Sequence, residues 1–137
     1  MAEDIKEITF CDQPSLLVVT CSSGVSRFLA DEIEALGFEV TRVSELAVET
    51  SGTLEDCMRL NLHLRTAHRV LYALEKFRAK TPEDLYRAIY QIPWENYLEP
   101  NGYFSIDRSV DTPTIRDTRY ASLKVKDAIV DRMRSKY

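Results

Sequence analysis

Glycine is scarce in this chain, and its four copies, Gly24, Gly37, Gly52 and Gly102, stand far apart from one another. Loops that cradle phosphates or dinucleotides need several glycines at short, fixed spacings, because the backbone must approach the ligand closely. No such spacing occurs here. The sequence therefore contains no recognisable loop for binding ATP or a dinucleotide.

Histidine and cysteine are also rare. His63 and His68 are five residues apart, so they point to different sides of a helix, whereas helical zinc sites use a spacing of four. Cys11, Cys21 and Cys57 form no C-x-x-C pair. Cys21 follows an apolar run with no histidine nearby in sequence, so a buried cysteine is a better interpretation than a nucleophile. We predict no metal site, no catalytic residue and reduced thiols.

No apolar run approaches the roughly 18 residues that a membrane span needs. The first ten residues, MAEDIKEITF, are acidic and lack the basic and then apolar layout of a secretory signal. Together with the unpaired cysteines, these features predict a cytoplasmic protein.

The net charge of −4 conceals a gradient along the chain. Residues 1–64 hold twelve acidic and four basic residues, whereas residues 65–137 hold ten acidic and fourteen basic ones. The overall acidity therefore does not exclude a polyanionic partner, and such a partner should meet the second half. An uneven scatter of surface charge explains the same numbers, and composition does not decide between the two.

Hydrophobic periodicity predicts an α+β protein. Apolar, β-branched or alternating runs are typical of strands, and apolar residues recurring every three or four positions are typical of helices. The predicted strands are 15–21, 38–44, 46–50, 69–79 and 103–110, and the predicted helices are 22–37, 54–66, 81–92 and 121–137.

Four local signals mark the ends of the predicted helices. Ser22 or Ser23 can cap the first helix at its start, and Gly37 suits its end. Thr53 with Asp56 resembles a capping box. Thr81 followed by Pro82 and two acidic residues is the strongest helix start in the sequence.

Basic residues gather around the last predicted helix. On a helical wheel Arg119 and Lys126 share one flank of the apolar stripe, and Lys124 lies on the other flank near Asp127. The preceding segment adds Arg108 and Arg116. Such a cluster can follow phosphates without reading sequence. The alternative is a solvated amphipathic helix with charge pairs such as Lys124 with Asp127.

Three aromatic residues precede this helix: Trp94, Tyr97 and Tyr103. Aromatic rings can stack on unpaired bases. More often they anchor a core or a loop, and the sequence leaves both interpretations open.

Four segments of the chain resemble the N-terminal region of bacterial THUMP-containing RNA methyltransferases. They are LVVTCSSGVSRFLADEIEALG, GTLEDCMRLNLHLRTAHRVL, KTPEDLYRAIYQIPWENYL and ASLKVKDAIVDRMRSKY. The resemblance covers nearly the whole chain from about Ser15, in the family's order, and NLHLRTAHRVL and LKVKDAIVD are its most specific segments. That family modifies N2 of guanine in large-subunit ribosomal RNA, and close relatives act on transfer RNA.

The resemblance implies a ferredoxin-like subdomain over residues 1–50 and an RNA-binding THUMP domain over residues 51–137 that lacks its final strands. It implies structured RNA as the partner, ribosomal more than transfer RNA. It also implies S-adenosylmethionine as the cofactor of a methyltransferase domain in the same or another chain, with no cofactor in this one. Resemblance and charge together suggest Arg65, Arg69, Lys124 and Lys126 as RNA contacts, and charge alone adds Arg108, Arg116 and Arg119.

In the family further strands and a catalytic domain follow the helix that resembles residues 123–137. We therefore expect a fragment of a longer RNA methyltransferase that orients RNA for a distant active site. An open sheet edge would then invite self-association. The alternative is a stand-alone THUMP-like subunit that binds RNA or acts as a scaffold for a separate enzyme.

Overall fold

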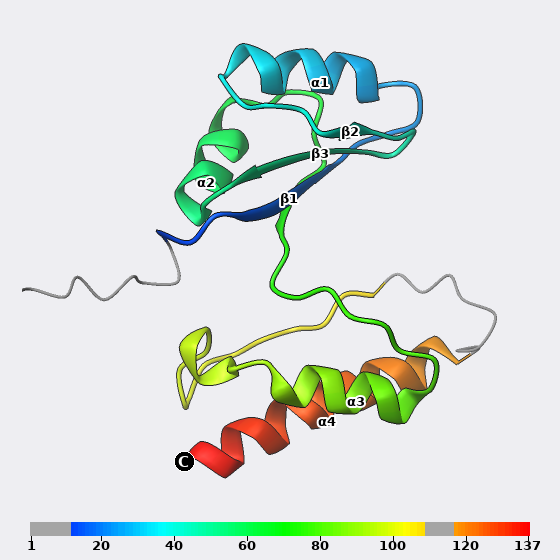
Figure 1. The fold of residues 1–137 in the computed structure, drawn as a ribbon, viewed down its shortest axis with the longest axis vertical. Helices are drawn as coiled ribbons and strands as arrows, with labels where there is room; N and C mark the ends of the chain where they lie inside the picture. Colours follow the sequence, from blue (N-terminus) through cyan, green and yellow to red (C-terminus); the bar gives the residue numbers. More distant parts are fainter. Residues whose placement is uncertain (1–11, 109–116) are drawn as a thin grey trace, which may run out of the picture. The chain divides into compact units, whose positions relative to one another are not determined.

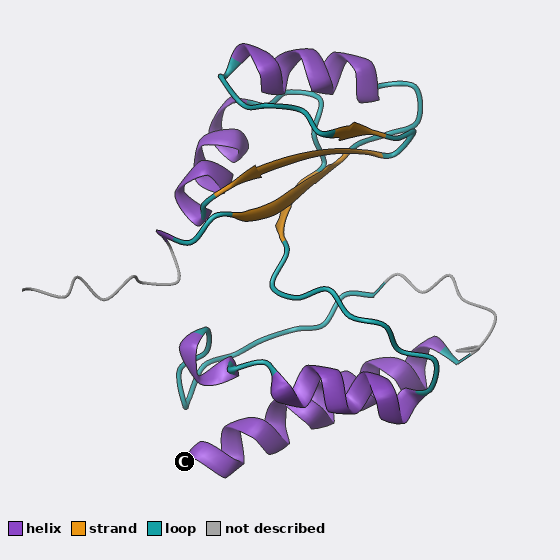
Figure 2. Cartoon of the chain, in the orientation of Figure 1, coloured by secondary structure: helices purple, strands orange, loops and turns teal. Residues whose placement is uncertain are grey.

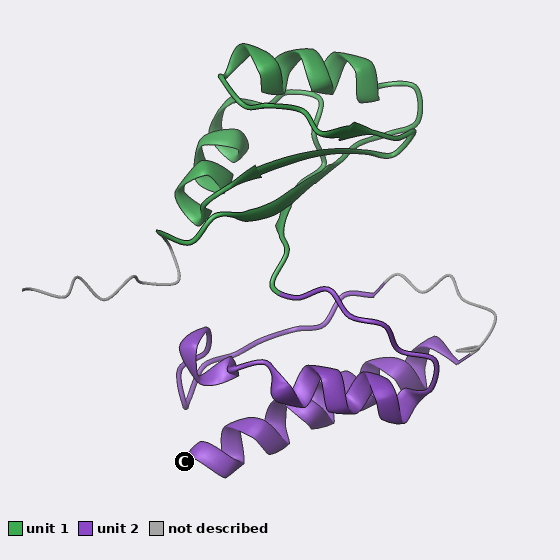
Figure 3. Ribbon diagram, viewed as in Figure 1, with its two compact units in different colours: residues 1–74 green, residues 75–137 purple. Residues whose placement is uncertain are grey.

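A computed structural model describes residues 12–108 and 117–137 of the chain. The chain divides into two compact units, Met1–Leu74 and Glu75–Tyr137 (Figure 3). Each unit has its own set of packed elements, so each is described separately.

The first unit follows the order β-α-β-β-α-β. Its sheet has the strand order β2-β3-β1-β4, and all neighbouring strands are antiparallel. Both helices cover the same face of this sheet (Figure 1). The elements are β1 (Ser15–Thr20), α1 (Ser26–Ala35), β2 (Arg42–Val43), β3 (Ala47–Gly52), α2 (Leu54–His63) and β4 (Arg69–Tyr72).

The core of this unit lies between the sheet and the two helices. Alternate residues of β1 and β3 point into it, so Leu17, Val19 and Val48 are fully buried. Leu29 and Leu60 enter from the helices. Burial of these side chains provides the main driving force for folding of the unit, at roughly 1.5–3 kcal/mol for each large aliphatic residue.

The sequence predicts the end of α1 correctly but not its start. The helix starts at Ser26 after Val25, and no side chain caps it, so the predicted cap at Ser22 or Ser23 is wrong. Ser23 instead donates a hydrogen bond to Glu45, at 2.6 Å. Gly37 follows the end of the helix with φ of +93°, in the left-handed region that the prediction requires.

The start of α2 confirms the predicted capping box. Asp56 N donates to the Thr53 hydroxyl at 3.2 Å, and Thr53 N donates to the Asp56 carboxylate at 2.9 Å. Gly52 lies so close that a Cβ there would fall 2.7 Å from the Asp56 carboxylate. The residue before the cap therefore has to be small.

The boundary between the units differs from the sequence-based division near residue 50. Strand β4 pairs with β1 over four residues, from Leu17 with Tyr72 to Thr20 with Arg69. Helix α2 packs on β3 and β4. These contacts make residues 51–74 part of the first unit, and the first unit then holds twelve acidic and six basic residues against ten and twelve in the second.

The second unit is a pair of packed helices with a connecting segment. Helices α3 (Pro82–Gln91) and α4 (Thr118–Lys136) lie side by side, and η2 (Trp94–Asn96) is a single turn that contacts α4 (Figures 1 and 2). Tyr86 of α3 donates a hydrogen bond to Asp131 of α4, at 2.5 Å. This hydrogen bond raises the pKa of Tyr86 to about 12, because the carboxylate favours the protonated phenol.

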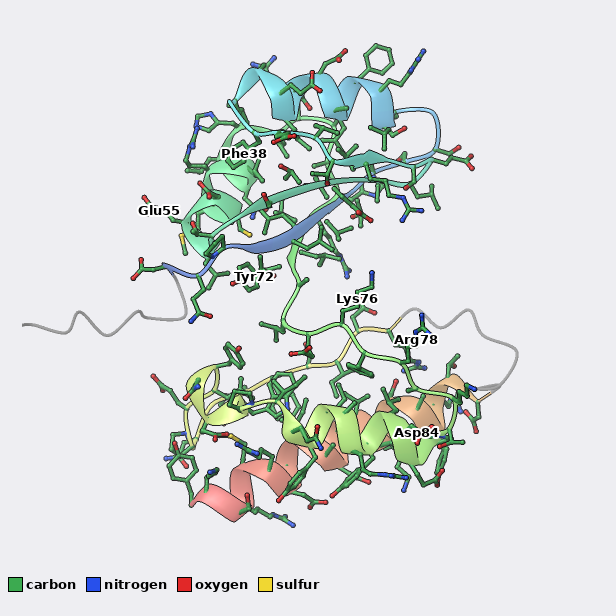
Figure 4. The ribbon with its side chains drawn as sticks, viewed as in Figure 1. Phe38, Glu55, Tyr72, Lys76, Arg78 and Asp84 are labelled. Atoms are coloured by element: carbon green, nitrogen blue, oxygen red, sulfur yellow. The ribbon has the colours of Figure 1, made fainter. Side chains whose placement is uncertain are left out.

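The predicted start of α3 is confirmed. Thr81 caps the helix, Pro82 occupies its first position, and Asp84, which is labelled in Figure 4, completes a capping box. Backbone hydrogen bonds from Lys80 and Thr81 lower the pKa of Asp84. The helix start depends only on neighbouring residues, which explains why the sequence alone predicted it; the capping box at Asp84 is an addition from the structure.

Three predicted strands are shorter than expected or absent. β2 spans only Arg42–Val43 of the predicted 38–44, and β4 ends at Tyr72 although 69–79 was predicted. Residues 103–108 are not assigned to a strand, and residues 109 and 110 lie outside the described ranges. A strand needs a hydrogen-bonded partner, and no described strand pairs with 103–108, so its alternating pattern is not sufficient.

The buried position of Leu60 leads to a stability prediction. Leu60→Ala should lower the free energy of unfolding by about 2–5 kcal/mol, because it leaves a cavity in the core. Leu62→Ala on the same helix is the control, since Leu62 is 81% exposed and should change stability little. Urea unfolding measures both variants, and equal losses would contradict the placement of the core.

Candidate nucleic-acid interface

A groove of about 710 Å³ runs along α4 in the second unit. Residues 102–108 form one side, and one face of α4 forms the other. The extended segment leaves a turn in which Gly102 N donates to the Glu99 carbonyl, at 2.9 Å. Apolar side chains line much of the groove: Tyr103, Phe104, Ile106, Leu123 and Val130.

Three of the predicted cations line this groove: Arg108, Arg119 and Lys126. Arg119, Lys126 and the apolar Leu123 and Val130 recur at the spacing of a single helix face. The opposite side of α4 is buried at Ala121 and Ala128. The helix is thereby held with its cationic flank toward the groove.

Asp117 fixes the start of α4 and so the position of Arg119. Its side chain accepts hydrogen bonds from the backbone amides of Arg119 and Tyr120, at 3.0 and 3.2 Å. Arg119 and Lys126 are exposed, and neither forms an ion pair with any residue of the described ranges. Their charges are therefore available to an anionic ligand.

Lys124 lies on a different face of α4, as its place on the helical wheel predicts. Its ammonium group lies 5.8 Å from the centre of the Tyr86 ring and 5.6 Å from that of Tyr120. Cation–π contacts of this kind stabilise a charge in place by about 0.5–1 kcal/mol at exposed sites. Lys124 is not among the residues that line the groove.

Two further cations of α4 are used inside the unit. Arg132 forms a two-pronged ion pair with Glu95 of η2, with nitrogen–oxygen distances of 2.6 and 3.0 Å. The Lys136 ammonium lies 3.6 Å from the same carboxylate. The hydrogen bonds from Arg132 lower the pKa of Glu95 to about 2. Arg132 and Lys136 therefore hold η2 against α4.

Arg65 and Arg69 belong to the first unit, so they form a set separate from the groove. Both are exposed. Arg65 follows α2, where its backbone amide donates to Glu32 at 3.1 Å. Arg69 opens β4, where its amide donates to the Thr20 hydroxyl at 3.2 Å. Arg116, the remaining predicted contact, lies outside the described residues.

Arg134 was not among the predicted contacts, although it lines a second groove of about 370 Å³. This groove shares Gly102, Phe104 and Val130 with the first, so the two are continuous along α4. The helical spacing that places Arg119, Lys126 and Val130 on one face also places Arg134 near that face, so this spacing could have predicted Arg134 from the sequence.

The three aromatic candidates have different surroundings. Trp94 donates its indole N–H to the Ile89 carbonyl at 2.7 Å, and Tyr97 packs edge-on against it with ring centres 6.1 Å apart. Both rings therefore anchor η2. Tyr103 is fully exposed beside the groove, which leaves its ring free to stack.

No group of three metal-binding side chains occurs within residues 12–108 and 117–137. Cys21 and Cys57 are buried free thiols, and burial raises the pKa of Cys57. The ring nitrogen Nε2 of His68 lies 3.1 Å from the Ser22 hydroxyl. In the same ranges, no helix is long and apolar enough to cross a membrane.

Family models match both units. Residues 16–71 match the RlmL ferredoxin-like domain, and residues 79–137 match the THUMP domain. The chain is thus a ferredoxin-like domain followed by a THUMP domain, which confirms the predicted fold class. The first match ends, and the second begins, within four residues of the boundary between the two structural units.

The chain is similar to the N-terminal part of the ribosomal RNA large subunit methyltransferases K/L, as the resemblance of its sequence indicated. It is 40% identical over 119 residues to the member from Pseudomonas syringae pv. tomato, and 36% identical over 126 residues to that from Syntrophotalea carbinolica. These alignments cover 87% and 92% of this chain, but only 16% and 18% of those proteins.

A solved structure shares the fold. A protein from Listeria monocytogenes, described as a predicted N6-adenine-specific DNA methylase, superposes with a TM-score of 0.82 at 32% identity. The superposition covers 91% of this chain and 33% of that one. This chain therefore corresponds to about a third of that longer chain.

The Glu95 ion pair predicts how stability depends on pH. Folding lowers the pKa of Glu95 from 4.5 to about 2, so the stabilisation is complete above pH 4.5 and disappears as pH falls toward 2. Glu95→Gln should therefore lower the thermal midpoint by a few degrees at pH 7, with no difference from the wild type near pH 2.

Glu99→Gln is the matched control, because Glu99 is exposed in the same segment. Thermal unfolding followed by circular dichroism between pH 2 and 7 makes the comparison. A deficit for Glu95→Gln that stays constant over that range would show that the ion pair is not its cause.

Proposed function

We propose that this chain is the RNA-targeting module of a ribosomal RNA methyltransferase, and that it orients structured RNA for a catalytic domain. The observation that carries the proposal is the gathering of Arg108, Arg119 and Lys126 along one groove. These three charges come from two separate segments of the second unit. An anionic polymer can contact all of them at once.

The composition of the groove fits RNA better than a small anion. Cations lie beside an apolar lining, and Tyr103 is exposed next to it. Phosphates would contact Arg119 and Lys126, and an unpaired base could stack on the Tyr103 ring. This arrangement grips the backbone and does not read a base sequence, as expected of a targeting module.

The finer assignments follow from the relatives. Large-subunit ribosomal RNA is the proposed partner, and the cytoplasm, where ribosomes are made, is the proposed location. S-adenosylmethionine would supply the methyl group in the catalytic domain. The described residues do not fit that cofactor, because Gly24, Gly37, Gly52 and Gly102 stand singly and form no glycine-rich loop. The only role that we propose for residues of this chain is binding to RNA.

Charge reversal tests the groove directly. Arg119→Glu with Lys126→Glu should weaken binding to a stem-loop transcript of large-subunit ribosomal RNA by at least tenfold at 50 mM salt. Losing two phosphate contacts should also lower the slope of log affinity against log salt by about 1.8. Fluorescence anisotropy at several salt concentrations measures both quantities.

Lys76→Glu with Lys80→Glu is the control, since these exposed linker residues carry the same charge and lie outside the groove (Lys76 is labelled in Figure 4). An equal loss in both double variants would mean that only net charge matters, and the groove would then not be the binding site.

A second function, contact with another polypeptide, is favoured by the apolar surface of the same region. Phe104 and Leu123 are 38% and 55% exposed, and residues 103–108 are extended without a described partner strand. Extended segments of this kind can accept a strand from another chain. A catalytic domain or a second copy would cover this surface.

Self-association tests this second function. The 137-residue chain should form dimers or larger species as its concentration rises, and Phe104→Asp with Leu123→Asp should keep it monomeric. Leu62→Asp, at an exposed apolar residue of the first unit, should have no effect. Sedimentation velocity gives the answer, and a wild-type monomer at several hundred micromolar would contradict the prediction.

A further inference from the structure

A single carboxylate organises the segment that carries Arg65 and Arg69. Glu32, near the end of α1, accepts hydrogen bonds from the backbone amides of Arg65 and Thr66, each at 3.1 Å. It also accepts one from the Thr66 hydroxyl, at 2.5 Å. Three donors from adjacent residues thus converge on one side chain that is 33 positions away in sequence.

The other end of the same segment is tied to β1. The His68 amide donates to the Thr20 carbonyl at 2.7 Å, and the Arg69 amide donates to the Thr20 hydroxyl at 3.2 Å. Residues 65–69 are therefore fixed at both ends, by Glu32 at one and by Thr20 at the other. The end at Arg69 is also held by the pairing of β4 with β1. At the end formed by Arg65 and Thr66, the described side-chain contacts come from Glu32.

The contact favours the charged form of Glu32. Its pKa is lowered, chiefly by the hydrogen bond from Thr66, with smaller effects of the Arg65 and Thr66 amides and the Arg65 charge. An amide in place of this carboxylate would turn an N–H₂ group toward at least one donor that needs an acceptor, the Arg65 amide or the two Thr66 donors, depending on its orientation. Glutamine is therefore a close steric match that cannot make the same set of bonds.

We propose that Glu32 is a positioning residue for RNA binding, which holds the segment 65–69 so that Arg65 and Arg69 present their guanidinium groups to the RNA backbone. This inference rests on the proposed function. It explains why an acidic residue would be useful beside a phosphate-binding segment. Ordering this segment in advance removes a conformational-entropy cost that RNA binding would otherwise have to offset.

Simple electrostatics predicts the opposite sign for a Glu32 variant. Removing a negative charge near bound RNA should strengthen binding or leave it unchanged. Glu34→Gln gives this baseline, because Glu34 lies on the same helix, is exposed and undergoes the same change of charge. If Glu32 positions the arginines, Glu32→Gln should instead weaken binding relative to Glu34→Gln.

The experiment combines hydrogen exchange with RNA binding on the 137-residue chain. In Glu32→Gln the Arg65 and Thr66 amides should exchange at least tenfold faster, while core amides such as Leu17 match those of Glu34→Gln. Affinity for the ribosomal stem-loop transcript should fall about five- to tenfold. The salt slope should fall by up to about 1.8, the contribution of two phosphate contacts.

Thr66 provides an independent check. Thr66→Ser keeps the hydroxyl that donates to Glu32 and should bind RNA like the wild type. Thr66→Val keeps the shape but loses the donor, and it should reproduce part of the Glu32→Gln loss.

The outcomes separate the two proposals. Faster exchange with RNA affinity and salt slope equal to those of Glu34→Gln would make Glu32 purely structural and refute the positioning role. Unchanged exchange would refute the contact itself. Wild-type protein that shows no salt-dependent RNA binding would overturn the proposed function, and the positioning role with it.

Discussion

The charge balance of the chain constrains everything that it can bind. Acidic residues outnumber basic ones. A basic side chain is therefore available to an anionic ligand only where the fold keeps it away from the carboxylates of the protein itself. The structure does so selectively on α4. Arg132 and Lys136 form ion pairs with Glu95. Arg119 and Lys126 line the groove and have no such partner in the described part of the chain.

The same helix therefore has two separate tasks. One side binds the rest of the second unit, through buried alanines, the Asp131 contact with Tyr86 and the Glu95 ion pair. The opposite side faces the groove, because the helical period of 3.6 residues places Arg119, Lys126 and Val130 on one face. In the first unit a carboxylate has a supporting role, because Glu32 holds the segment that carries two exposed arginines. Negative charge is thus used to place positive charge.

Features that depend on neighbouring residues could be predicted from the sequence. The capping box at Thr53, the helix start at Thr81 and the separation of Lys124 from Lys126 follow from local spacing, and the structure confirms them. Features that depend on distant partners could not. The alternating residues 103–108 lack a described strand to pair with, and the register of β4 with β1 attaches residues 51–74 to the first unit. The resemblance supplied the family, while the convergence of residues 102–108 with α4 required the fold.

The central claim is that RNA lies along the groove of the second unit. Ultraviolet cross-linking of the chain to the ribosomal stem-loop transcript, followed by mass spectrometry of the linked peptides, tests it most directly. We expect cross-links within residues 102–108, with Tyr103 foremost, and within 119–126. Cross-links confined to the exposed acidic side of α1, around Asp31 and Glu34, would contradict the account.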